Sequence, residues 1–81
     1  MAVNAPAMSP QDSALQLKAK VELRINPKTE AFSKDLKVTV QNAVITIGGQ
    51  APSEMDAKAA ERILHGISGV VGIVNNIEAK A

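Results

Sequence analysis

The chain has 81 residues, the length of one small domain, and a domain of this size has little room for an enclosed active-site cavity. Its composition, 46% hydrophobic and 21% charged, is that of a globular protein and excludes a disordered chain. Nine basic residues against eight acidic ones leave a formal charge of +1, and Phe32 is the only aromatic residue. The basic surface and the stacking rings that nucleic-acid binding uses are therefore both missing, and we predict no nucleic-acid partner.

Reactive side chains are scarce. The chain has no cysteine and a single histidine, His65, which excludes a thiolate nucleophile, a cysteine zinc site and a cluster of histidine ligands. The eight carboxylates are scattered, and no pair of them is placed to share a pocket. We therefore predict a protein that is not an enzyme, with no catalytic residue, no metal ligand and no cofactor. Backbone carbonyls could still bind a cation such as potassium or calcium without leaving a side-chain pattern.

Residues 1–11 mix small and polar residues with Pro6 and Pro10 and show no regular period, so we predict a flexible leader followed by one domain over residues 12–81. Neither the basic and apolar regions of a signal peptide nor 18 consecutive apolar residues occur. We therefore predict no signal peptide in this chain and no transmembrane segment. If Met1 is the native start, these features favour a cytoplasmic protein.

The first predicted element is a helix over residues 12–25. Asp12 or Ser13 is a good N-cap, and apolar residues then recur at helical spacing. Pro27 ends the helix, because the residue before a proline is pushed out of the helical region. Residues 28–35 are polar and predict a loop, with room for one helical turn, that Phe32 anchors in the core.

Two strands and a tight turn follow the loop. Apolar and polar residues alternate over residues 36–41, which is the period of a strand with one face in the core; the inward residues are Leu36, Val38 and Val40. Asn42-Ala43 stands where a two-residue hairpin turn would be. The β-branched residues 44–47 then predict a second strand, which ends at Gly48-Gly49.

A second helix and a third strand complete the chain. Ser53 is the predicted N-cap of a helix that runs to about His65, with Asp56 in place of the usual Glu of a capping box. We predict that one arc of this helix packs on the sheet; it comprises Met55, Ala59, Ala60, Ile63 and Ile67. Gly66 and Gly69 then end the helix with left-handed backbone angles, and residues 70–77 form the third strand.

This order of elements predicts the fold. A strand–helix–strand crossover is right-handed in nearly all proteins, which places the third strand parallel to the second and both helices on the same side of the sheet. The predicted fold class is therefore α+β: an αββαβ sandwich in which a three-stranded mixed sheet has two helices packed on one face.

Hydrophobic positions and glycines recur in a definite order along residues 12–80. They are Leu36, Val38, Val40, the run 42–49, Ala60, Ile63, Ile67, Gly69-Val70, Ile73, Asn75 and Ile77. In this order and spacing they resemble the BON domain, a family named for bacterial osmotically inducible and nodulation proteins. The resemblance implies an αββαβ fold, a location in the bacterial periplasm or cell envelope, and a module that binds phospholipid or membrane surfaces without catalysis.

Ala43 departs from the family pattern, which usually has glycine at this position of the hairpin turn. A type I′ turn would hold Ala43 at positive φ at a cost of about 1 kcal/mol. We therefore expect either a strained turn or a turn of a different type.

The first helix carries two apolar stripes, and one sheet can cover only one of them. Leu15, Ala19 and Leu23 form one stripe; Leu17, Val21 and Ile25 form the other, about 160° around the helix. Alignment of Asp12 and Pro27 with the BON pattern places the first stripe inward. The second, which we name the outer stripe, is then flanked by Lys18, Lys20 and Arg24, and these six residues are the candidate binding surface.

Three interpretations of the outer stripe are open. An apolar stripe between cations is typical of a helix that lies on a membrane of anionic phospholipid. The same stripe could contact another protein domain or a second copy of the chain, which would make a homo-oligomer. Alternatively it belongs to the core, either because Leu17 and Val21 point inward or because Phe32 and its loop fold over it.

Overall fold

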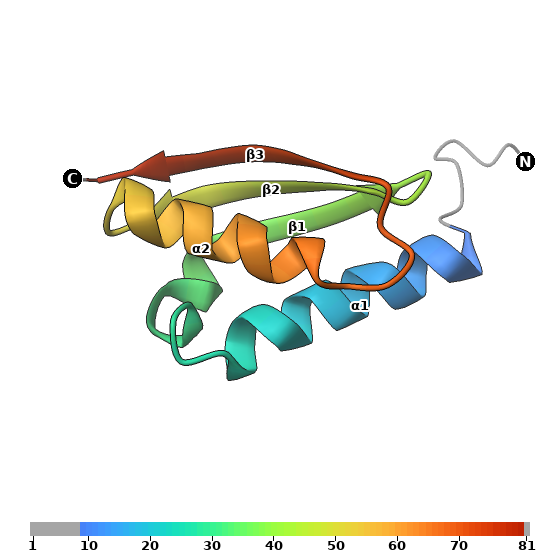
Figure 1. Ribbon diagram of the computed structural model, residues 1–81, viewed down its shortest axis with the longest axis horizontal. Helices are drawn as coiled ribbons and strands as arrows, with labels where there is room; N and C mark the ends of the chain where they lie inside the picture. The colour runs from blue at the N-terminus through green and yellow to red at the C-terminus, as the bar shows by residue number, and fades with distance from the viewer. Residues whose placement is uncertain (1–8, 81) are drawn as a thin grey trace, which may run out of the picture.

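Six elements follow one another in the computed structural model, which describes residues 9–80. They are α1 (Pro10–Ile25), the 3-10 helix η1 (Glu30–Asp35), β1 (Leu36–Gln41), β2 (Val44–Ala51), α2 (Glu54–His65) and β3 (Gly72–Ala79). β2 is the middle strand, antiparallel to β1 and parallel to β3, and both helices pack on one face of the sheet (Figure 1). The predicted α+β fold, with a three-stranded mixed sheet and two helices on one face, is confirmed.

Helix α1 begins earlier than the sequence analysis predicts. Its N-cap is Ser9, whose Oγ accepts a hydrogen bond from the Asp12 amide at 3.0 Å, and Pro10 is in the first turn. The prediction of Asp12 or Ser13 as N-cap is therefore wrong: a proline at the start of a helix is favourable, because its missing N–H would have had no partner there. Residues 1–8 of the predicted leader lie outside the described residues, whereas Pro10 and Gln11 are helical. The helix ends at Ile25, as predicted.

The β1–β2 hairpin has a strained two-residue turn. Asn42 and Ala43 have φ values of 53° and 64°, which are those of a type I′ turn, so the first of the two alternatives is realised. Asp12 lies beside the turn, and its carboxylate accepts the Asn42 and Ala43 amides, each at 2.9 Å. The buried Asp12 therefore holds a turn that lacks the usual glycine.

The middle strand is longer than predicted, and the third strand is shifted by two residues. β2 continues through Gly48-Gly49 to Ala51, and β3 runs over 72–79 instead of 70–77. The two strands stay in register from Val44 opposite Gly72 to Ala51 opposite Ala79. The predicted end at the glycines is wrong because a strand ladder is built from backbone groups, which glycine also supplies.

Helix α2 has the predicted bounds but a different buried face. Ser53 Oγ accepts the Asp56 amide at 3.1 Å, as expected for the N-cap. The residues that face the sheet are Ala57, Ala60 and Leu64, followed by Ile67, whereas Met55 is 81% exposed and Ala59 and Ile63 are half-buried. The predicted arc is thus wrong at its N-terminal end. Gly66 is right-handed with φ −78°, against the prediction, and Gly69 has the predicted positive φ of 96°.

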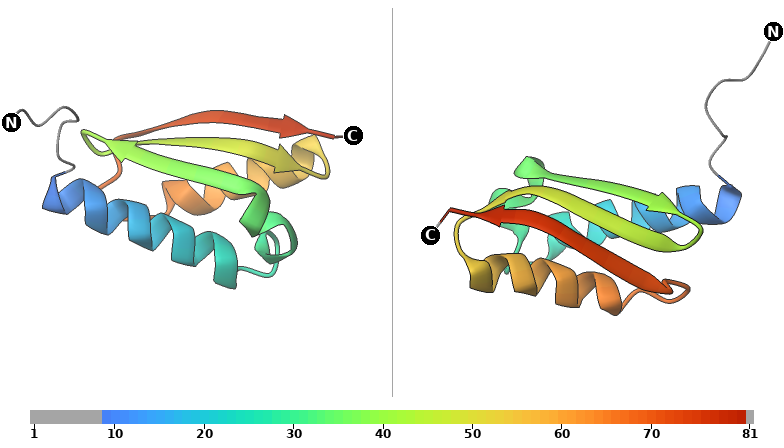
Figure 2. Two further views of the ribbon diagram at one scale, coloured as in Figure 1. Left: turned by 180° about the vertical axis from the view of Figure 1, so that it is seen from behind. Right: turned by 90° about the horizontal axis from the view of Figure 1, so that it is seen from above.

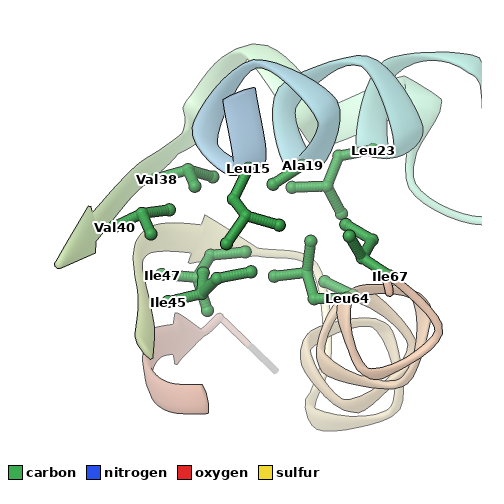
Figure 3. Packing of buried hydrophobic residues seen from close by; sticks show 10 residues of the cluster. Leu15, Ala19, Leu23, Val38, Val40, Ile45, Ile47, Leu64 and Ile67 are labelled. Atoms are coloured by element: carbon green, nitrogen blue, oxygen red, sulfur yellow. The ribbon is translucent and has the colours of Figure 1, made fainter. Parts of the chain in front are cut away.

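The core lies between the two helices and the sheet. Figure 3 shows its main cluster, with Leu15, Ala19 and Leu23 from α1, Val38 and Val40 from β1, Ile45 and Ile47 from β2, and Leu64 and Ile67 from the α2 region. Phe32 is buried in a second, smaller cluster with Ala51 and Ala57, which confirms its predicted role as an anchor. Within residues 9–80, no helix covers the opposite face of the sheet (Figure 2).

Candidate functional site

The outer stripe of α1 is exposed. Leu17 and Ile25 are 65% and 64% exposed and Val21 is 41% exposed, whereas the opposite stripe of Leu15, Ala19 and Leu23 is buried. The stripe of α1 that faces the sheet is therefore the one that the family pattern indicated. The interpretation of the outer stripe as core is wrong in both of its forms: Leu17 and Val21 point outward, and Phe32 packs on Ala51 and Ala57 instead.

The three predicted cations lie on both sides of the outer stripe. At about 100° per residue, Lys18 lies on one side of it and Lys20 and Arg24 on the other. All three are exposed, and none forms an ion pair with any residue between 9 and 80, where Glu61–His65 is the sole pair. Their charges are thus free to meet an external anion.

A cavity of about 340 Å³ lies beside the outer stripe, between α1, η1 and β1. Its apolar lining comes from the core residues Leu23 and Val38 and from Leu36, and its polar lining comprises Lys20, Arg24, Lys34 and Ser33. Three cations around an apolar floor are suited to an anionic group attached to a hydrocarbon. Sequence reasoning missed Lys34 and Ser33, because no periodic signal shows where the segment 28–35 folds back on the helix.

The other ionisable contacts hold the fold. Glu61 Oε1 accepts the Asn75 side-chain amide at 2.9 Å, which ties α2 to β3, and the opposite carboxylate oxygen lies 3.5 Å from His65 Nε2. The Asn75 hydrogen bond, with help from His65, lowers the pKa of Glu61 despite partial desolvation. The hydrogen bond with the Ala43 amide, together with those of the Asn42 amide and the Ser9 side chain, likewise lowers the pKa of Asp12. Both carboxylates are thus committed to structural contacts.

The described residues provide neither a metal site nor a membrane-spanning helix. No three His, Asp or Glu side chains between residues 9 and 80 come together as a metal site. None of the helices in that range combines the length and the apolar character needed to cross a bilayer.

Comparisons with known proteins bear on the whole domain. A search of curated proteins finds no match to the chain. The family model of the BON domain, in contrast, matches residues 11–81, which include every element of the sheet and both helices except the first residue of α1. The chain therefore belongs to the BON domain family. The exposed stripe, with its cations, is a feature of this family member, as is the αββαβ core.

Proposed function

We propose that this protein is a non-catalytic binding module that attaches to anionic phospholipid at a membrane surface in the bacterial cell envelope. The contact is made by the outer stripe of α1 with Lys18, Lys20 and Arg24. The observation that carries the proposal is the exposure of three large apolar side chains between cations that have no ion-pair partner among residues 9–80. Membership of the BON domain family supports both the module and its location.

The strength of such a contact follows from its parts. Complete burial of a Leu, Ile or Val side chain contributes about 1.5–3 kcal/mol, and the outer stripe retains between two fifths and two thirds of its exposed surface for that purpose. Each cation close to an anionic surface adds about 1 kcal/mol. Immobilisation of the domain offsets part of this gain, so the expected attachment is reversible and sensitive to salt.

The cavity beside the stripe suggests how a headgroup would be held. A lipid phosphate can approach Lys20, Arg24 and Lys34 together, while the adjoining acyl chain contacts the apolar floor. This arrangement makes the proposed contact selective for anionic over zwitterionic lipid, because a choline headgroup would bring its own positive charge to the three cations.

The second candidate function is association with protein. An exposed apolar stripe also suits a protein partner, and β1 and β3 each have one edge that pairs with no other strand of residues 9–80. Sedimentation of the protein at increasing concentration distinguishes the two functions. Self-association appears without lipid, whereas a lipid-binding module stays monomeric until vesicles are added.

Vesicle co-sedimentation tests the proposal. The double variant Leu17→Ser/Val21→Ser is compared with Val71→Ser/Val74→Ser, in which two other exposed apolar residues are changed in and just before β3. We expect the unmodified protein and the β3 variant to pellet with phosphatidylglycerol vesicles but not with phosphatidylcholine vesicles, and the α1 variant to remain in solution. Equal pelleting of both variants would remove the outer stripe from the contact.

A further inference from the structure

In both helices the basic residues face further away from the sheet than the acidic residues do. Angles around each helix follow from 100° per residue, counted from a fully buried residue, Ala19 in α1 and Leu64 in α2. The carboxylates of both helices then lie within about 80° of the direction that faces the sheet; they are Asp12, Glu22, Glu54, Asp56 and Glu61. The basic residues lie about 100° or more from it; they are Lys18, Lys20, Arg24, Lys58 and Arg62. The outward half of α1 thus bears cations and no carboxylate, whereas on α2 Glu54 and Asp56 lie at the edge of the half that bears the cations.

The outward half of α2 also has an apolar centre. Met55 lies opposite Leu64 on the helix and is 81% exposed, the highest exposure of any large apolar residue described. A cavity of about 410 Å³ adjoins it, lined by Met55, Ala59, Lys28, Lys58, Arg62 and Asp56. The Asp56 carboxylate accepts a hydrogen bond from Ser53 Oγ at 2.9 Å, so it is engaged with the helix cap. An exposed apolar side chain next to cations, as on α1, is therefore also present on α2.

Both helices lie on the same side of the sheet, and the outward half of each faces away from the core. Figures 1 and 2 show α1 and α2 on one side of the sheet, and the core lies between them and the strands. Lys28, which follows the end of α1, lines the same cavity as Met55, so a surface that meets this side of the helical layer can meet groups from both helical segments. If α1 alone touched the membrane, Met55, Lys58 and Arg62 would face water beside it and would contribute nothing to the binding free energy.

We infer that α2 is a second membrane-contacting element, and that the domain lies with its whole helical layer on the anionic bilayer and its uncovered sheet face toward water. Met55 enters the acyl boundary beside the outer stripe, and Lys28, Lys58 and Arg62 meet lipid phosphates. This inference rests on the proposed function and adds to it a second contact and an orientation of the domain.

A fluorescent label reports the orientation directly. Because the chain has no cysteine, a cysteine introduced at one position is its only thiol and takes a polarity-sensitive NBD label there. Three variants are compared: Leu17→Cys on α1, Met55→Cys on α2 and Val74→Cys on the uncovered sheet face. With phosphatidylglycerol vesicles we expect NBD emission to rise and shift to the blue at positions 17 and 55, and to stay unchanged at 74.

Each other outcome has a distinct meaning. A response at 17 without one at 55 overturns the inference and leaves the proposed function intact. No response at 17 or 55 overturns both. A response at 74 equal to that at 55 overturns the orientation. If the labels at positions 17 and 55 become shielded without vesicles, and more so at higher protein concentration, the surface serves self-association. That result overturns both proposals.

Charge removal gives a second, label-free measurement. Lys58→Gln/Arg62→Gln is compared with the sheet pair Lys37→Gln/Lys80→Gln, which makes the same change in net charge at exposed positions in β1 and directly after β3. Each cation near an anionic surface is worth about fivefold in affinity, so the α2 pair should weaken vesicle binding about 25-fold. The sheet pair should have a much smaller effect, and equal losses for the two pairs would overturn the role of α2.

Discussion

Gly49 is the position where a single methyl group should most damage the fold. It lies in β2 opposite Leu36 of β1 and has φ +113°, a conformation that other residues rarely adopt. A Cβ at this position would overlap the carbonyl oxygen of Asp35 and lie 3.0 Å from the Leu36 Cα, and both are backbone atoms that cannot turn aside. Gly49→Ala therefore has to force β1 away from β2 as well as strain its own backbone.

The expected loss can be built from these two effects. The unfavourable φ costs about 1–3 kcal/mol, and the displaced start of β1 loses at least one ladder hydrogen bond, about 1 kcal/mol. A loss of about 3 kcal/mol is a large share of the roughly 4–12 kcal/mol that a chain of this length has in total. With a urea m-value of about 1 kcal/mol/M, the midpoint should fall by about 3 M.

Gly48→Ala is the matched control. No heavy atom lies within 4 Å of a Cβ built on Gly48, so this variant should change stability by no more than about 0.5 kcal/mol. Urea unfolding is followed by circular dichroism at 222 nm, because the chain has no Trp or Tyr for fluorescence. Equal midpoints for the two alanine variants would refute the close approach of β1 to Gly49.

Two further predictions concern α1. The pKa of Asp12 is lowered in the folded state, so its contribution to stability is present above about pH 4 and is lost as the pH falls through the folded pKa. The urea midpoint of Asp12→Asn should therefore lie below that of the unmodified protein at pH 7 and approach it at pH 3; a gap of constant size would contradict this. Leu23→Ala should cost about 2–5 kcal/mol by opening the core, whereas Leu17→Ala should cost less than about 0.5 kcal/mol. Similar losses, measured by the same urea unfolding, would mean that both stripes of α1 are buried.

Patterns that repeat over several residues predicted the fold well. The alternation over residues 36–41 gave the correct inward set in β1, and the two stripes of α1 together with the family pattern gave its correct inward face. Periodic burial leaves a periodic sequence, because one face of each element meets the core. The sequence left open whether the outer stripe was exposed or belonged to the core, and the structure shows that it is exposed.

Contacts between distant segments were not predictable. Asp12 resembled an N-cap in sequence, yet it binds a turn 30 residues away. Met55 was predicted to be buried because it is large and apolar, but α2 lies close to the sheet through the small residues Ala57 and Ala60 and leaves Met55 outside. Lys34 joined the candidate site only because η1 folds back beside α1. Each of these depends on tertiary geometry that local sequence does not encode.

The capping of α1 by Ser9 bears on how the domain is excised or fused to other proteins. The family match begins at Gln11, which is already inside the helix. A fragment cut at that boundary would lose the Ser9 hydroxyl that accepts the Asp12 amide, a change that typically costs about 1 kcal/mol. The first turn of α1 would then fray, and this turn carries the Asp12 carboxylate that accepts hydrogen bonds from the hairpin turn. A fragment of this domain that is to be expressed alone or fused to another protein should therefore include Ser9.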